Sequence, residues 1–244
     1  MPVMSKINLE HFKVKKAPDT VYYIPNFISK EEEKYLTEQV YSVPKPKWKQ
    51  LSKRRLQNWG GLPHPKGMVV EKLPKWLEVY CQQIADLGAF GDLVPNHVLV
   101  NEYHTGQGIM PHEDGPLFHP VVTTISLGSH TFLDFYQHRR DASGDGESLV
   151  QQPQDSDSSP EDAVQHPILS LLLEPRSLLI LMKDMYTTYL HGIAERGHDV
   201  VTDQVPNLAQ TGRELGDTLE RSCRISLTIR HVPKTLKVKL FGKR

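Results

Sequence analysis

The sequence predicts an α+β fold that is mainly β: a sandwich or jelly roll with helices near the N-terminus packed outside one sheet. Two helical patterns come early in the chain, and from residue 98 onward they are replaced by short β-type runs separated by turn signals. A length of 244 residues fits a single domain over residues 1–244.

The first elements are a strand and two helices. Residues 21–24 read as a strand, and Ser29 with Glu32 has the spacing of a capping box, which predicts that a helix starts there. Pro74 suits the first turn of a second helix, whose apolar residues recur at helical spacing until Gly88 provides a natural stop. Both helices are amphipathic, so each is expected to cover a sheet.

The remaining elements are strands. The expected strands are residues 98–103, 121–127, 131–136, 168–173, 177–182 and 224–232. Residues 137–167 contain seven acidic residues and cannot bury a core, so we expect an acidic, disordered insertion there. Residues 195–221 are also polar and are expected to form a long loop. We expect neither segment to carry catalytic groups.

Composition excludes several classes of protein. Lys plus Arg number 29 and Asp plus Glu number 29, so any nucleic acid must be held by a local basic patch rather than by net charge. Two cysteines make a disulfide framework implausible. No run approaches the roughly 20 apolar residues of a membrane helix, and no signal peptide is evident. We therefore expect no membrane partner and a cytoplasmic and nuclear location.

The first element of chemistry is the pair His112 and Asp114. Residues two apart on an extended chain point to the same side, so an imidazole and a carboxylate can meet one cation. This spacing alone is weak, because it also occurs by chance in turns with solvated side chains.

The second element is the alternating run 224–230, which places Arg224 and Arg230 on one face of a strand and isoleucine and leucine on the other. Buried arginines need anions to pair with, although an edge strand with a solvated basic face would fit the same pattern. Alternation also puts Asn101 and Tyr103 on a common face, where both can donate hydrogen bonds to one ligand.

In combination these motifs resemble the AlkB family of iron and 2-oxoglutarate dioxygenases. The likeness runs from Asn101 and Tyr103 through His112 and Asp114 to the His191-Gly192 pair and the two arginines, and it covers nearly the whole chain. Residues 57–63 and 108–116 are similar to one vertebrate branch of the family.

The resemblance implies a double-stranded β-helix and a facial triad, with Fe(II), 2-oxoglutarate and O2 as cofactor and co-substrates. The implied metal ligands are His112, Asp114 and His191. His191 is preferred to His198 and His231 because it follows the strand 178–182 and matches the family's His-Gly. The implied co-substrate residues are Arg224 and Tyr103 at the distal carboxylate, and Asn101, Ser226 and Arg230 at the iron end.

The resemblance also implies oxidation of a C–H bond coupled to decarboxylation of 2-oxoglutarate, and loss of formaldehyde where the carbon is an N-methyl group. Residues 44–67 match the family's nucleotide-recognition lid in position and include six Lys or Arg between residues 44 and 55. The candidate substrate residues are Trp48, Lys49, Lys53, Arg54, Arg55 and Trp59. A solvated loop anchored to the sheet by its tryptophans is the alternative reading.

The expected substrate is modified nucleic acid, DNA or RNA, with single strands favoured. Family members that repair nucleic acid usually carry an acidic residue two positions after the metal aspartate, whereas Gly115 and Pro116 follow Asp114 here. The alternatives are a protein or small-molecule oxygenase of the same chemistry and a non-catalytic nucleic-acid-binding module. A structural zinc site would need four closed ligands, and the motifs bring together only three.

Overall fold

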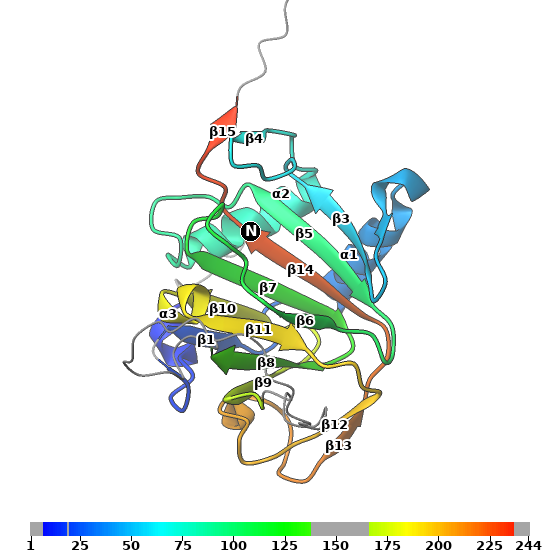
Figure 1. Cartoon of the computed structure of the whole chain (residues 1–244), viewed down its shortest axis with the longest axis vertical. Coiled ribbons are helices and arrows are strands. Elements are labelled where there is room, and N and C mark those ends of the chain that lie inside the picture. Colours follow the sequence, from blue (N-terminus) through cyan, green and yellow to red (C-terminus); the bar gives the residue numbers. More distant parts are fainter. Residues whose placement is uncertain (1–6, 19, 138–165, 237–244) are drawn as a thin grey trace, which may run out of the picture.

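Two antiparallel β-sheets face each other, and two helices cover the outer face of the larger one (Figure 1). The computed structural model describes residues 7–18, 20–137 and 166–236. The large sheet has the order β1 (Val21–Ile24), β10 (Leu178–Met182), β7 (Val121–Gly128), β14 (Arg224–Arg230), β5 (His97–Tyr103), β3 (Arg55–Trp59) and β2 (Lys49–Gln50). The small sheet has the order β6 (Ile109–His112), β11 (Tyr189–Ile193), β8 (Thr131–Gln137) and β9 (Leu169–Leu173).

The minor elements lie around the two sheets. They comprise the helix α3 (Asp184–Thr187), the 3-10 helices at Leu9–Phe12, Lys45–Lys47 and Leu208–Gln210, the pair β12 (His198–Val200) and β13 (Thr218–Glu220), and the parallel pair β4 (Met68–Val69) and β15 (Thr235–Leu236). No helix in the described ranges is long and apolar enough to cross a membrane.

The helices form where their sequence signals predict. Helix α1 (Lys30–Ser42) begins at a complete capping box, in which Ser29 Oγ accepts from the Glu32 amide at 3.1 Å and Glu32 accepts from the Ser29 amide at 2.7 Å. Helix α2 (Lys75–Asp86) follows Pro74. Buried side chains of both helices pack against the large sheet in one hydrophobic cluster.

The strands of the large sheet separate two environments, because alternate side chains point to opposite faces. Ile225, Leu227 and Ile229 of β14 are buried against the helices, whereas Arg224 and Arg230 point into the space between the sheets. A second apolar cluster, including Phe135, Leu171 and Leu181, fills part of that space. The prediction of a mainly β jelly roll with helices outside one sheet is confirmed.

The predicted strands are all present, with ends that differ by two residues at most. Three strands that carry or border the site were not predicted, namely β3, β6 and β11. Strand β6 contains Pro111, and β11 is five residues long with a glycine in it, so neither has the alternation by which a strand is recognised.

The segment 195–221 was expected to be a long polar loop and is more structured than that. It contains the β12–β13 pair, and its Val201, Val205 and Leu219 are buried against the small sheet. Asp199 is fully buried and accepts two hydrogen bonds from Arg221, at 2.6 and 2.7 Å. Opposite charges that pair with each other made the segment look solvated in the sequence. Most of the insertion expected at 137–167 lies outside the described residues.

Candidate functional site

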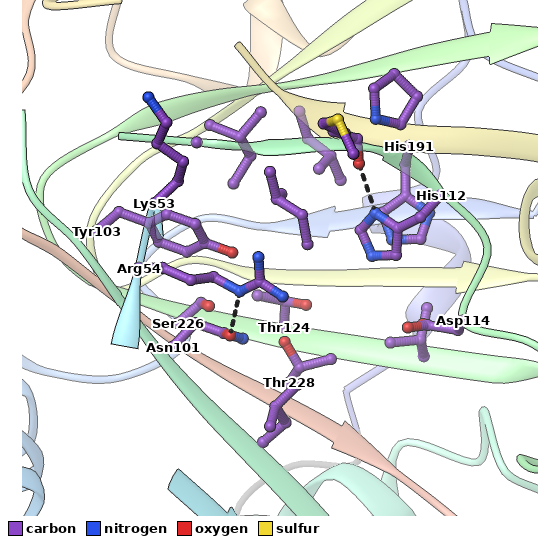
Figure 2. Close-up of a pocket in the computed structure, with 18 of the residues that line it drawn as sticks. Lys53, Arg54, Asn101, Tyr103, His112, Asp114, Thr124, His191, Ser226 and Thr228 are labelled. Carbon is purple, nitrogen blue, oxygen red and sulfur yellow. Dashed lines mark hydrogen bonds between the residues drawn. The ribbon is translucent and has the colours of Figure 1, made fainter. Parts of the chain in front are cut away.

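A cavity of about 720 Å³ lies between the two sheets. Its floor is the polar face of β14, β5 and β7, and its wall is formed by β6 and β11. The turn between β2 and β3 supplies Ser52, Lys53 and Arg54 at the rim. Figure 2 shows the predicted metal ligands grouped at one end of the cavity and Tyr103 with the β2–β3 turn at the other.

His112, Asp114 and His191 converge at one end of this cavity. Strand β6 ends at His112, which lies opposite His191 of β11 in the antiparallel register, and Asp114 follows two residues later. One ligand atom from each of the three lies within 4.8 Å of the others. Two imidazoles and one carboxylate on one side of an ion leave other coordination positions open, which is the donor set of non-haem Fe(II) oxygenases.

The hydrogen bond of His112 and the burial of His191 both favour metal binding. His112 Nδ1 lies 2.9 Å from the Met110 carbonyl oxygen, so that nitrogen carries the proton and Nε2 is left as the ligand. Burial lowers the pKa of His191 to about 4, despite the opposing effect of Asp114. His191 is therefore neutral at physiological pH, and neutral imidazole is the form that binds metals.

The carboxylate of Asp114 is held at one oxygen only. Arg230 Nη2 lies 2.8 Å from Asp114 Oδ1, whereas Asp114 Oδ2 is buried without a hydrogen-bond partner. A buried carboxylate oxygen without a partner is costly unless a cation or donor reaches it. The residues present therefore fit a divalent metal ion, with Arg230 fixing the orientation of the carboxylate.

Arg224 is a buried, positively charged side chain to which an anion could bind. The side chain is only 3% exposed, and it donates from Nη2 to Ser126 Oγ at 3.0 Å, while Nε and Nη1 have no partner. Burial lowers the pKa of Arg224 to about 10, which still leaves it charged at neutral pH. The planar guanidinium thus has N–H groups without partners on both of its edges, where a carboxylate could bind, and the Tyr103 ring lies alongside.

The other predicted co-substrate residues share this polar face. Asn101 pairs with Ser226, and Tyr103 with Arg224, across the β5–β14 register. Asn101, Ser226 and Arg230 all line the cavity (Figure 2 labels the first two). The structure thus places all eight sequence-predicted metal and co-substrate residues around one cavity.

The predicted substrate residues are divided between two faces of the sheet. Lys53 and Arg54 line the cavity, but Arg55 points to the helix side, where it pairs with buried Glu102 and stacks on Trp48 at 4.2 Å. Trp59 packs edge-on against Trp76 of α2, with centroids 5.7 Å apart. Lys49 does not line the cavity either.

The packing of the two tryptophans favours the alternative reading, in which they anchor the segment to the sheet. Alternation along β3 sends Arg55, Gln57 and Trp59 to the helix-covered face, and both tryptophans pack on the core there. Residues 44–67 are tied into the edge of the large sheet by β2 and β3, as an anchored segment rather than a detached lid.

Three further residues at the site were missed in the sequence. Glu195 lines the rim and pairs with Lys53 at 2.9 Å, in a segment, 195–221, that was expected to carry no catalytic groups. Met110 is a cavity residue that is 81% exposed. Tyr186 of α3 donates to the Gly115 carbonyl at 2.9 Å, next to the metal carboxylate. No spacing in the sequence indicates the contacts of Glu195 and Tyr186, because each joins distant segments.

Fold and site together define a class of enzyme. Residues 26–230 match the model of the 2OG-Fe(II) oxygenase superfamily, and the chain belongs to that superfamily as a 2-oxoglutarate-dependent dioxygenase. Within it the chain is AlkB-like. It is 57% identical over 239 residues to a Danio rerio protein named probable RNA/DNA demethylase ALKBH6, an alignment that covers 98% of this chain and 97% of the relative.

More distant relatives agree with this placement. A Xenopus tropicalis tRNA (carboxymethyluridine(34)-5-O)-methyltransferase, alkbh8, is 26% identical over 231 residues, which cover 88% of this chain and 32% of that protein. The solved structure of OsALKBH1 superposes with a TM-score of 0.53 at 13% identity, covering 89% of this chain and all of that one. This structural likeness supports the fold, a double-stranded β-helix.

Proposed function

We propose that this dioxygenase hydroxylates or oxidatively demethylates modified nucleic acid, with His112, Asp114 and His191 holding Fe(II). One observation carries the proposal: an open set of three metal ligands and an unpaired, buried arginine face the same cavity. When bound, iron and 2-oxoglutarate would supply the oxidation of a substrate C–H bond by O2, with succinate and CO2 as co-products.

The protein's own side chains would bind the co-substrate, orient the carboxylate of the metal site and exclude water. Arg224 and Tyr103 would hold the distal carboxylate of 2-oxoglutarate, with Asn101 and Ser226 as polar neighbours on the cavity floor. Arg230 orients Asp114 through the 2.8 Å contact. Apolar side chains of the cavity wall, including Leu133 and Leu181, limit the water around the reacting centre.

A nucleic-acid substrate is supported by the 57% identical relative, which is named a probable RNA/DNA demethylase, and by cations at the rim. Lys53 lies at the rim, and Lys45 and Lys49 precede it on the exposed β2 side of the same segment. A cytoplasmic and nuclear location, where RNA and DNA are found, is part of this proposal. Single-stranded substrates are favoured because a target base must leave a duplex to enter a cavity.

A protein or small-molecule substrate is the second candidate, and two observations favour it. Glu195 neutralises Lys53 at the rim, so the mouth of the cavity is less cationic than the run of basic residues in the sequence implies. The chain also has no acidic residue at position 115 or 116, after Asp114.

The test measures succinate and formaldehyde production with Fe(II), 2-oxoglutarate and O2, with and without single-stranded oligonucleotides that carry N-methylated bases. We expect a methylated oligonucleotide to increase succinate formation and to release formaldehyde, and Asp114→Ala to abolish both. Succinate without any response to nucleic acid would contradict the proposed substrate but keep the oxygenase. Absence of succinate with every substrate tested would favour a binding module.

A further inference from the structure

Arg54 occupies an unusual position for a loop arginine. It belongs to the turn between β2 and β3, outside the facing sheets, yet its side chain enters the cavity and Nε donates to Asn101 Oδ1 at 3.2 Å. Figure 2 shows the guanidinium extending past the Tyr103 ring toward the middle of the cavity, on the side that faces the metal ligands.

The charges that line the cavity are unevenly paired. Lys53 pairs with Glu195 at 2.9 Å and Arg230 pairs with Asp114 at 2.8 Å. In the part of the chain that the structure describes, no acidic side chain forms an ion pair with Arg54 or with Arg224. Two guanidinium groups without anionic partners among the described residues therefore face one cavity, which is the complement of a small dianion.

Both arginines flank the same polar strand. Arg224 comes from β14, which pairs with one edge of β5, and Arg54 comes from the turn that precedes β3, which pairs with the other edge. Asn101 and Tyr103 of β5 lie between them, and the charges of both arginines act on the Tyr103 hydroxyl. A ligand lying along β5 would be within reach of one guanidinium at each side.

We propose that Arg54 is a further co-substrate arginine, beside Arg224 and Arg230, and that it binds a carboxylate group of 2-oxoglutarate beside Asn101. The proposal rests on the proposed function and adds a residue to its site. A substrate phosphate is the other anion that Arg54 could meet, but the guanidinium points inward to the cavity floor, whereas Lys53 is the cation at the solvent side of the same turn.

A co-substrate bound to Arg54 would also affect the rim of the cavity. The turn that carries Arg54 is also joined to the opposite rim through Lys53 and Glu195, so a co-substrate bound to Arg54 would hold the turn over the cavity. The bound dicarboxylate would then order the turn before the substrate arrives.

The experiment is calorimetric titration of 2-oxoglutarate into the full-length protein loaded with Mn(II), without O2. We expect Arg54→Gln to weaken binding by about tenfold to a hundredfold, the usual effect of losing a charge-assisted pair, and Arg54→Lys to weaken it less. Arg213→Gln, the same change at an exposed arginine paired with Glu174, is the matched control and should bind as the parent does.

A second measurement follows the turn itself. Trypsin can cleave after Lys53, Arg54 and Arg55, and the first and last of these sites remain in Arg54→Gln. We expect 2-oxoglutarate with Mn(II) to slow cleavage at these two sites in the parent but not in Arg54→Gln. Titration of a single-stranded oligonucleotide completes the set, and Arg54→Gln should leave its affinity unchanged.

Three outcomes separate the possibilities. If Arg54→Gln binds 2-oxoglutarate like the parent while Arg224→Gln does not, the assignment of Arg54 is wrong and the proposed function stands. If Arg54→Gln loses oligonucleotide affinity and keeps 2-oxoglutarate affinity, Arg54 is a phosphate contact instead. If the parent itself does not bind 2-oxoglutarate, the proposed function and the role of Arg54 both fail.

Discussion

His112 and His191 lie opposite each other on neighbouring antiparallel strands, with ring centroids 4.5 Å apart. This register places two imidazoles side by side, and the chain needs only two more residues after His112 to bring Asp114 to the same point. The pairing of β6 with β11 therefore determines whether a metal site exists at all.

Replacing His191 with alanine should weaken Fe(II) binding by more than a hundredfold, because loss of a ligand costs more than the tenfold to hundredfold typical of an outer contact. Metal titration under anaerobic conditions measures this. His198→Ala is the control, since His198 is exposed on β12 and away from the cavity. The reverse ranking of the two variants would show that the ligand set is misassigned.

The polar face of the site was predictable because alternation within a strand is encoded in that strand alone. Arg224, Ser226 and Arg230 share a face in the sequence and line one cavity in the structure. The register of β6 against β11 was not predictable, because strand pairing depends on segments about 80 residues apart that each lack a pattern.

The candidate lid, residues 44–67, shows a different limit of prediction from the sequence. A run of basic residues and tryptophans predicts an exposed nucleic-acid surface, but only the β3–β5 pairing decides which side chains face the cavity. Once β3 joins the sheet, Trp59 and Arg55 must point to the helices. Likewise Asp199 and Arg221 look solvated in the sequence, and only their contact reveals a buried ion pair.

Arg224→Ala should reduce 2-oxoglutarate affinity by about 1.5 to 3 kcal/mol, the range for hydrogen bonds to charged groups. Arg224→Lys should lose less, because it retains the charge but not the planar pair of donors. Calorimetry with Mn(II)-loaded protein measures both. Unchanged affinities in the two variants would place the co-substrate elsewhere.

Tyr186→Phe should weaken metal binding although Tyr186 is no ligand. Its hydroxyl holds the Gly115 carbonyl at 2.9 Å and so fixes the backbone next to Asp114, and outer contacts of this kind are typically worth tenfold or more in metal affinity. Anaerobic metal titration is the measurement. Tyr80→Phe removes a comparable hydroxyl contact, to Glu32 at 3.4 Å on the helix side, and should leave metal affinity unchanged.

The buried carboxylate of Asp199 should make the free energy of unfolding depend on pH in the acid range. Burial would raise the pKa of Asp199, but hydrogen bonds from His130 and Arg221 and the nearby arginine charges outweigh burial and hold the pKa well below its ordinary value. Because the pKa is lower in the folded than in the unfolded state, the stabilisation is complete above the ordinary carboxyl pKa and is lost as the pH falls below about 4.

Asp199→Asn should therefore lower the free energy of unfolding by about 3 kcal/mol at pH 7, since it leaves the Arg221 charge buried. The difference from the parent should shrink once the pH is well below the ordinary carboxyl pKa, as urea unfolding at pH 7 and at about pH 3 would show. Lys75→Ala breaks an exposed pair with Glu78 and should leave stability nearly unchanged. An equal loss at both pH values would mean that the charge of Asp199 is unimportant.

If nucleic acid binds at the rim, mutation of the two partners of one ion pair should change its affinity in opposite directions. Lys53→Gln should lower affinity for a single-stranded oligonucleotide and reduce the slope of log K against log salt by about one, because one phosphate contact is lost. Glu195→Gln should raise affinity, because it frees Lys53 from its 2.9 Å partner. Fluorescence anisotropy at several salt concentrations measures both effects.

The tryptophans provide the internal control for this prediction. Trp48 and Trp59 pack on the helix side of the sheet, so Trp48→Phe and Trp59→Phe should leave affinity and salt slope unchanged while lowering thermal stability. A stacking residue would instead cost about 1 to 3 kcal/mol of affinity when it is removed. If the tryptophan variants lose affinity and the Lys53 and Glu195 variants do not, nucleic acid binds the helix-covered side, and the rim of the cavity must serve a different substrate.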